Sequence, residues 1–147
     1  MIFRTFGIFF QQMTEFGFPK KEHLCGDKNI EKLHTSGKSF LVYPLRIVYL
    51  VVENEDVPVR VIVSVSKKKF KRAVKRNKIK RLMRETYRLN KTDVTNFVNE
   101  NKHHLHIAFQ YIANEIEPFQ SINEKMILAL KKIIQKLTTD ENSEKSN

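Results

Sequence analysis

The sequence predicts an α+β fold, a single domain in which one sheet has helices packed mainly on one of its faces. Three observations predict it. The chain has 147 residues, of which 41% are apolar, and this is enough to bury one modest core. Segments of strand-like composition alternate along the chain with segments of helical periodicity. No internal repeat or long linker divides the sequence.

The first predicted element is a short helix over residues 27–36. Ile30 and Leu33 are apolar positions among polar neighbours, and Gly37 follows them as a stop signal.

Two strands joined by a polar turn are predicted next. Residues 39–52 are rich in Val, Ile, Leu and Tyr, with Pro44 near their start, and the polar run ENED follows at 53–56. Residues 57–66 then place valines at every second position. A hairpin formed by these two neighbouring strands is the simplest interpretation.

Residues 67–84 (KKKFKRAVKRNKIKRLMR) hold eleven Lys or Arg and no acid. The whole chain has 27 basic and 16 acidic side chains, so this window holds the entire formal excess of +11. A solvated helix normally mixes Glu with Lys, because opposite charges one turn apart stabilise it and like charges destabilise it. The composition therefore favours a surface that binds a polyanion.

The second half of this basic window has helical periodicity. One arc is expected to face the sheet: Ile79, Leu82, Met83 and Thr86. The opposite arc is a stripe of cations with polar flanks: Arg76, Lys80 and Arg84, flanked by Asn77, Arg81 and Arg88.

A further strand and a final helix complete the predicted domain. Residues 105–113 (LHIAFQYIA) have strand composition, and Pro118 opens the helix. Its core-facing positions are Phe119, Ile122, Met126, Leu130, Ile133 and Leu137.

The domain is expected to span residues 19–138. Residues 1–18 are predicted to be a disordered extension, with Met13 as a second candidate start, because their apolar run is too short and too interrupted for a signal peptide or a membrane span. Residues 139–147 are polar and are predicted to be a disordered tail.

The charge pattern favours nucleic acid over a membrane surface as the partner. Membrane binding needs bulky apolar residues opposite the cations that are free to insert, and the apolar arc of this helix is expected to pack on the sheet. No zinc-finger spacing, leucine zipper, helix-turn-helix or aromatic RNP motif is present.

No catalytic or metal site is predicted from the side chains. His104 and His106 would share a strand face, but we expect them to be exposed strand histidines, because the sequence shows no Cys or carboxylate cluster beside them. Cys25 is the only cysteine, which excludes an internal disulfide and favours a reducing cytoplasm. No paired carboxylates of the kind used by two-metal nucleases are visible.

Residues 63–88, VSVSKKKFKRAVKRNKIKRLMRETYR, closely resemble the motif of the bacterial ribonuclease P protein component. In that family a Ser-Val-Ser-Lys-Lys strand end leads into an Ala-Val-x-Arg-Asn-Arg-x-Lys-Arg helix. The resemblance is dense over 61–88 and weaker from about 20 to 137. It implies a mainly antiparallel four-stranded sheet in the order helix, three strands, basic helix, strand, helix, with a left-handed βαβ crossover around the basic helix.

The resemblance implies the protein subunit of a ribonucleoprotein endonuclease. Its RNA subunit uses Mg²⁺ to cleave the 5′ leader from precursor tRNA, so the protein would bind the catalytic RNA and the leader without holding a cofactor or metal itself. The implied contacts with the catalytic RNA are Lys67, Lys68, Arg72, Lys75, Arg76, Asn77, Lys78, Lys80, Arg81 and Arg84. Lys78 stands at the third position of the family's Arg-Asn-Arg motif, where it keeps the charge but lacks the bidentate fork.

The same resemblance implies a leader cleft between the N-terminal helix and the sheet face, lined partly by aromatic rings that stack on unpaired bases. The matching helix positions are Ile30 and His34, where the family commonly has Phe. The strand positions are Tyr49 and Ile47, for which ordinary sheet core is the alternative. Phe40 is a further aromatic candidate.

Two other classes of function are considered. A structural RNA-binding protein of the ribosome would use the same cations as a scaffold and would have no reason to favour precursor over mature tRNA. A module that binds membrane surfaces would bind vesicles and ignore RNA.

Overall fold

The computed structural model describes residues 18–53 and 55–145, with side chains as far as residue 140. Apart from Phe18, the predicted extension at 1–18 and the candidate start at Met13 lie outside the described residues. The elements in chain order are η1 (Lys20–Glu22), α2 (Asp27–Ser36), β1 (Lys38–Val42), β2 (Leu45–Val52), β3 (Val59–Val65), α3 (Ala73–Asn90), α4 (Thr92–Glu100), β4 (His104–Tyr111) and α5 (Phe119–Lys145).

The four strands form one sheet in the order β1-β2-β4-β3. The β1/β2 and β2/β4 pairs are antiparallel, and β3 runs parallel to β4. The sheet is therefore mainly antiparallel, as predicted. The connection from β3 to β4 passes through both α3 and α4.

The predicted hairpin between the second and third strands is wrong. β4 lies between β2 and β3, and the hairpin is instead formed by β1 and β2, which turn at Tyr43 and Pro44. The reason is burial, because residues 105–109 of β4 are buried on both faces and such a strand belongs at the centre of a sheet.

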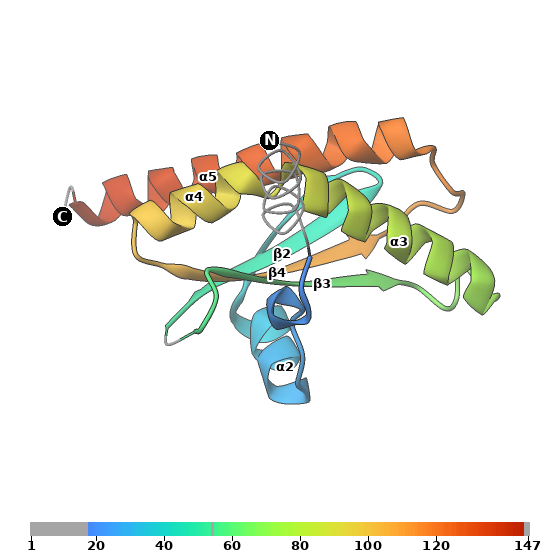
Figure 1. The fold of residues 1–147 in the computed structure, drawn as a ribbon, viewed down its shortest axis with the longest axis horizontal. Coiled ribbons are helices and arrows are strands. Elements are labelled where there is room, and N and C mark those ends of the chain that lie inside the picture. Colours follow the sequence, from blue (N-terminus) through green and yellow to red (C-terminus); the bar gives the residue numbers. More distant parts are fainter. Residues whose placement is uncertain (1–17, 54, 146–147) are drawn as a thin grey trace, which may run out of the picture.

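Helices cover both faces of the sheet unequally (Figure 1). α3, α4 and α5 lie over one face and α2 lies on the other. The larger core, under the three helices, includes Ile47, Tyr49 and Phe109, whereas the smaller core under α2 includes Leu33 and Val48. Successive residues of β2 thus point to opposite cores, as strand geometry requires.

Gly37 ends α2, as the sequence predicts, because of a close backbone approach. Its φ of −74° is open to any residue. A Cβ at this position would collide with the carbonyl oxygen of Leu33 and would lie only 3.0 Å from that of Tyr49. The chain therefore leaves α2 and enters β1 through a space that admits only glycine.

The basic helix packs as predicted. Ile79, Met83 and Thr86 are fully buried and Leu82 is half-buried. The polar stretch after it, for which the sequence analysis predicts no element, forms α4. Val94 and Val98, one turn apart, are both buried, and the partly buried Phe97 packs beside them, so one apolar face holds this short helix on the core.

The final helix is longer than predicted. Ile122, Met126, Leu130, Ile133 and Leu137 are buried, whereas Phe119 is 40% exposed. α5 continues to Lys145 and so runs through most of residues 139–147, the segment predicted as a disordered tail. Asp140 pairs with Lys38 of β1 at 2.7 Å, and this contact ties the added turns to the sheet.

Candidate nucleic-acid interface

The cations of residues 67–84 lie on the outer side of α3 and on the loop before it. The apolar arc of α3 is buried against the core, so its cationic arc faces solvent. We define the basic face as the ten predicted RNA contacts. Eight of them are exposed: Lys67, Lys68, Arg72, Lys75, Asn77, Lys78, Arg81 and Arg84. Arg76 and Lys80 are half-buried.

The first turn of α3 is unusually rich in positive charge. It contains no acid, its N-cap residue Arg72 makes no side-chain capping bond, and Lys75 and Arg76 follow. The first N–H groups of a helix lack intrahelical partners, and cations near this end oppose the helix dipole. A bound phosphate would relieve both effects, because it accepts from free N–H groups and carries negative charge.

Two cations of the window hold the loop that precedes α3. The Nη1 atom of Arg76 donates to the carbonyl oxygens of Phe70 and Lys71, both at 2.8 Å. Lys69 Nζ donates to the carbonyl oxygen of Ile112 at the end of β4. The structure therefore assigns Arg76 a folding role in addition to the predicted RNA contact, and its guanidinium keeps other N–H donors for a phosphate.

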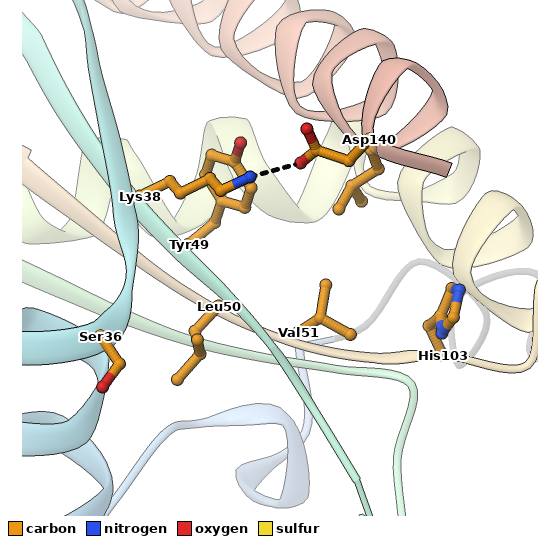
Figure 2. A pocket seen from close by; sticks show the side chains of 8 residues that line it. Ser36, Lys38, Tyr49, Leu50, Val51, His103 and Asp140 are labelled. Carbon is orange, nitrogen blue, oxygen red and sulfur yellow. Dashed lines mark hydrogen bonds and ion pairs between the residues drawn. The ribbon is translucent and has the colours of Figure 1, made fainter. Parts of the chain in front are cut away.

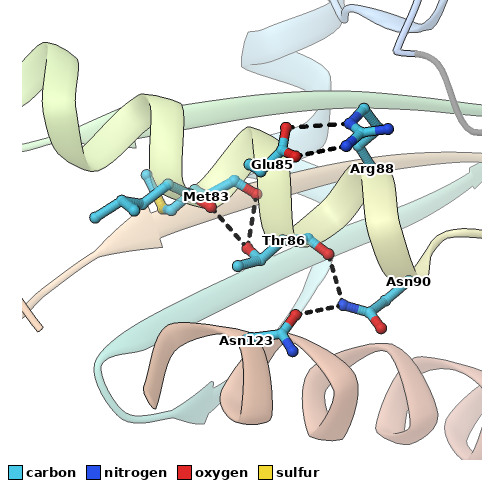
Figure 3. Close-up of polar contacts among 7 residues, drawn as sticks. Met83, Glu85, Thr86, Arg88, Asn90 and Asn123 are labelled. Carbon is cyan, nitrogen blue, oxygen red and sulfur yellow. Dashed lines mark hydrogen bonds and ion pairs between the residues drawn. The ribbon is translucent and has the colours of Figure 1, made fainter. Parts of the chain in front are cut away.

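The acid nearest the cation stripe along α3 is already paired. Glu85 accepts a hydrogen bond from Arg88 Nε at 3.1 Å, and this bond lowers the pKa of Glu85 against the opposing effect of burial. Figure 3 shows the pair on α3, together with the Asn90–Asn123 hydrogen bond of 2.7 Å that joins α3 to α5. The negative charge of Glu85 is thus compensated locally.

A groove lies between strands β1 and β2 and the C-terminal half of α5. It has a volume of about 610 Å³ and is lined by Lys38, Phe40, Tyr49, Lys132, Gln135, Lys136, Thr139 and Asp140. We call it the β1–α5 groove. A smaller hollow of about 280 Å³ shares Lys38, Tyr49 and Asp140 with it, and Figure 2 shows the Lys38–Asp140 pair among the side chains that line that hollow.

The β1–α5 groove combines aromatic rings with cations. The rings of Phe40 and Tyr49 meet edge to face with centroids 6.0 Å apart, and Lys136 Nζ lies 5.4 Å from the centroid of Phe40. Burial raises the pKa of the Tyr49 hydroxyl; the charge of Lys38 opposes this rise and that of Asp140 adds to it. The Tyr49 hydroxyl therefore stays protonated and can donate a hydrogen bond at neutral pH.

The four predicted leader contacts do not line one cleft, which corrects the prediction. Ile30 and His34 belong to α2 on one face of the sheet, whereas Ile47 and Tyr49 face the opposite core. Ile47 is completely buried, so the alternative of ordinary sheet core holds for it. Tyr49 is also packed, although its ring lines the β1–α5 groove, and His34 is exposed.

The sequence analysis missed part of this groove. Lys132 and Lys136 stand one turn apart on α5, and they could have been found as an i, i+4 pair of cations beside the apolar positions. Phe40 was considered without a spacing argument. Its place beside α5 depends on the pairing of β1 with β2, which local periodicity does not reveal.

His106 is buried, so the prediction of two exposed strand histidines is wrong for this residue. It lies 2.7 Å from Glu55 Oε1, while Arg60 Nε donates to Glu55 Oε2, also at 2.7 Å. His104 is half-buried, with Nδ1 3.1 Å from the carbonyl oxygen of Val57. The loop between β2 and β3 brings the carboxylate to the histidine, and sequence spacing did not show this.

Among the described residues, no three or more His, Cys, Asp or Glu side chains gather as a metal site would require. In the same part of the chain, every helix is too short or too polar to cross a bilayer.

Known proteins resemble this chain over most of its length. The family model described as Ribonuclease P matches residues 18–136. A ribonuclease P protein component from Porphyromonas gingivalis is 41% identical over 119 residues, which cover 80% of this chain and 87% of that protein. The corresponding protein of Chlorobaculum tepidum is 36% identical over 103 residues, covering 65% of this chain and 67% of the relative.

Solved structures show the same fold. An RNase P protein mutant from Staphylococcus aureus aligns with a TM-score of 0.62 at 23% identity, covering 85% of this chain and 95% of that one. The RNase P protein from Thermotoga maritima aligns with a TM-score of 0.59 at 22% identity, covering 76% of this chain and 96% of that one. The family match and the sequence identity together lead to one conclusion: this chain belongs to the ribonuclease P protein family.

Proposed function

We propose that the chain is the protein subunit of ribonuclease P and acts in tRNA processing in the cytoplasm. It binds the catalytic RNA through the basic face and holds the 5′ leader of precursor tRNA in the β1–α5 groove. The RNA subunit, with Mg²⁺, cuts the phosphodiester bond, and the protein supplies affinity. The observation that carries the proposal is the basic window, where eleven cations stand without an acid on one loop and helix.

The exposure of the basic face supports RNA as the partner. Each Lys or Arg that neutralises a phosphate releases condensed counterions, so a dense set of exposed cations gives strong binding that weakens with salt. The apolar arc of α3 is buried in the core, so it is not free to insert into a membrane. The uncapped first turn of α3 adds free N–H groups for a phosphate next to Arg72 and Lys75.

The chemistry of the β1–α5 groove suits an unpaired strand. Bases stack on aromatic rings without sequence preference, and cations along the groove follow the phosphates. Phe40 offers a half-buried ring, the Tyr49 hydroxyl offers a hydrogen-bond donor, and Lys132 and Lys136 offer the charge. This moves the proposed leader contact from Ile30 and His34 of α2 to the opposite face of the sheet.

Reconstitution with the ribonuclease P RNA of the same genome tests the proposal. The protein is expected to rescue cleavage of a 5′-leadered precursor tRNA at low Mg²⁺, and an Arg81→Ala/Arg84→Ala variant is expected to rescue it only at higher protein concentration. Lys28→Ala, which removes an exposed cation from α2, is the matched control and is expected to behave as wild type. RNA binding without rescue would overturn the proposal in favour of a ribosomal scaffold.

A further inference from the structure

A separate hollow lies beside the basic face, where the start of the described chain meets α3. Its volume is about 380 Å³ and its lining is Phe18, Asn77, Arg81, Arg84, Glu85 and Arg88. We call it the Phe18 hollow. It shares no residue with the β1–α5 groove, so it is a different candidate site.

Two neighbouring aromatic rings fix the position of the Phe18 ring. It stacks on His23 with ring centroids 4.2 Å apart and meets the buried ring of Tyr87 edge-on at 5.3 Å. The segment that carries it is anchored through Glu22, whose carboxylate oxygens both lie 2.9 Å from Nζ of the buried Lys91. The half-buried ring of Phe18 is therefore preorganised where it lines the hollow.

The rest of the lining matches the other parts of a nucleotide. Arg81 and Arg84 are exposed, and each guanidinium group can donate paired hydrogen bonds to a phosphate. Asn77 offers both a donor and an acceptor for a base edge. Glu85 is paired with Arg88, so the one acid in the lining does not oppose an anion.

We propose that the Phe18 hollow receives one unstacked nucleotide of the catalytic RNA, and this inference rests on the proposed function. The base packs against the Phe18 ring and its phosphate contacts Arg81 and Arg84. The volume lies within the range of small-molecule sites. Only an unpaired nucleotide fits this chemistry, because proteins recognise RNA bases by stacking where the bases are splayed out of a helix.

The binding test compares Phe18→Leu with Phe18→Tyr in the full chain. Leu keeps apolar packing on His23 and Tyr87 and removes the ring, whereas Tyr keeps the ring. Phe18→Leu is expected to weaken affinity for the ribonuclease P RNA by about 5- to 150-fold, the range for the loss of one stacked base. Phe18→Tyr is expected to bind as wild type, and so is the control Phe119→Leu on α5.

Two readouts separate stacking from a structural role. The slope of log affinity against log salt is expected to be unchanged in Phe18→Leu, because no cation is lost. Base-specific chemical probing at saturating protein is expected to show one unpaired nucleotide that wild type protects and that Phe18→Leu leaves reactive. Wild-type affinity in Phe18→Leu, or weaker binding without such a nucleotide, would overturn the inference. Failure of the wild type itself to bind this RNA would instead overturn the proposed function.

Discussion

Arg76 Nη1 donates a hydrogen bond to the carbonyl oxygen of Phe70 at 2.8 Å. Phe70 is buried, and its ring lies 6.0 Å from that of Tyr111 at the end of β4. A cation of the predicted RNA-binding stripe thus holds the loop that leads into α3. Some cations of the basic window, such as Arg76, stabilise the loop before α3, and others, such as Arg81, are exposed without such a contact to the described residues. Substitution is expected to affect stability in the first kind and RNA affinity in both.

Arg76→Ala is expected to lower both stability and RNA affinity, whereas Arg81→Ala lowers affinity alone. Loss of the charged hydrogen bonds to Phe70 and Lys71 costs about 1.5–3 kcal/mol, and loss of an exposed side chain such as Arg81 changes stability by less than about 0.5 kcal/mol. Urea unfolding of the free proteins measures the difference. Equal stability of the two variants would contradict the folding role of Arg76.

The salt dependence of RNA binding is expected to report the exposed cations of the basic face. Arg81→Ala/Arg84→Ala removes two phosphate contacts, so the slope of log affinity against log salt should become shallower by roughly 1.5. Lys28→Ala on α2 should leave the slope unchanged. Filter binding at several salt concentrations checks this, and an unchanged slope in the double variant would place these two residues outside the RNA contact.

Phe40→Ala is expected to reduce the preference of the reconstituted enzyme for precursor over mature tRNA. Loss of one stacked base costs about 1–3 kcal/mol, or about 5- to 150-fold. Affinity for mature tRNA, which lacks the leader, should not change. Leu41→Ala is the control, because Leu41 is the adjacent residue of β1 and is exposed. An equal loss of affinity for both tRNAs would argue against leader contact in the β1–α5 groove.

Glu22→Gln is expected to destabilise the fold strongly. It removes the carboxylate charge that lies 2.9 Å from Nζ of Lys91, whose side chain is only 8% exposed, and breaking such a pair costs about 3–5 kcal/mol. Glu31→Gln on exposed α2 should have little effect. In urea unfolding, Glu22→Leu/Lys91→Met should recover much of the lost stability, because it removes both charges. A double variant no more stable than Glu22→Gln would show that the pair is not the cause.

Glu55 is expected to make stability depend on pH in the acid range. Burial alone would raise its pKa, but the hydrogen bonds from His106 and Arg60 and their charges outweigh it and hold the pKa of Glu55 below its ordinary value of 4.5. A carboxyl group whose pKa is lower in the folded state than in the unfolded state stabilises the fold at pH values above its unfolded-state pKa. This stabilisation is lost as the pH falls through the folded-state pKa.

The difference in unfolding free energy between wild type and Glu55→Gln should therefore be largest near neutral pH and should narrow below pH 4.5. Urea unfolding between pH 3 and 7 measures this difference. Glu31→Gln is again the control, since Glu31 is exposed on α2. A difference that stays constant across this range would show that Glu55 does not titrate with a lowered pKa.

The sequence alone determined the helices that pack by regular periodicity and the nature of the main binding surface. The apolar arc of α3 could be predicted because residues three and four apart share a helix face. The basic face could be predicted because its charge is concentrated in one continuous segment and needs no distant residue to form. α4 escaped prediction because its contact with the core is narrow, formed by Val94, Val98 and the partly buried Phe97.

Tertiary structure decided which residues meet across the sheet. Alternation along β2 showed that Ile47 and Tyr49 share a face, but not that α2 covers the opposite one. Local pattern likewise does not place β4 between β2 and β3 or bring Phe18 beside Arg81. These arrangements come from the burial of apolar surface between segments far apart in the chain. The free energy of this burial depends on the whole fold and not on any one segment.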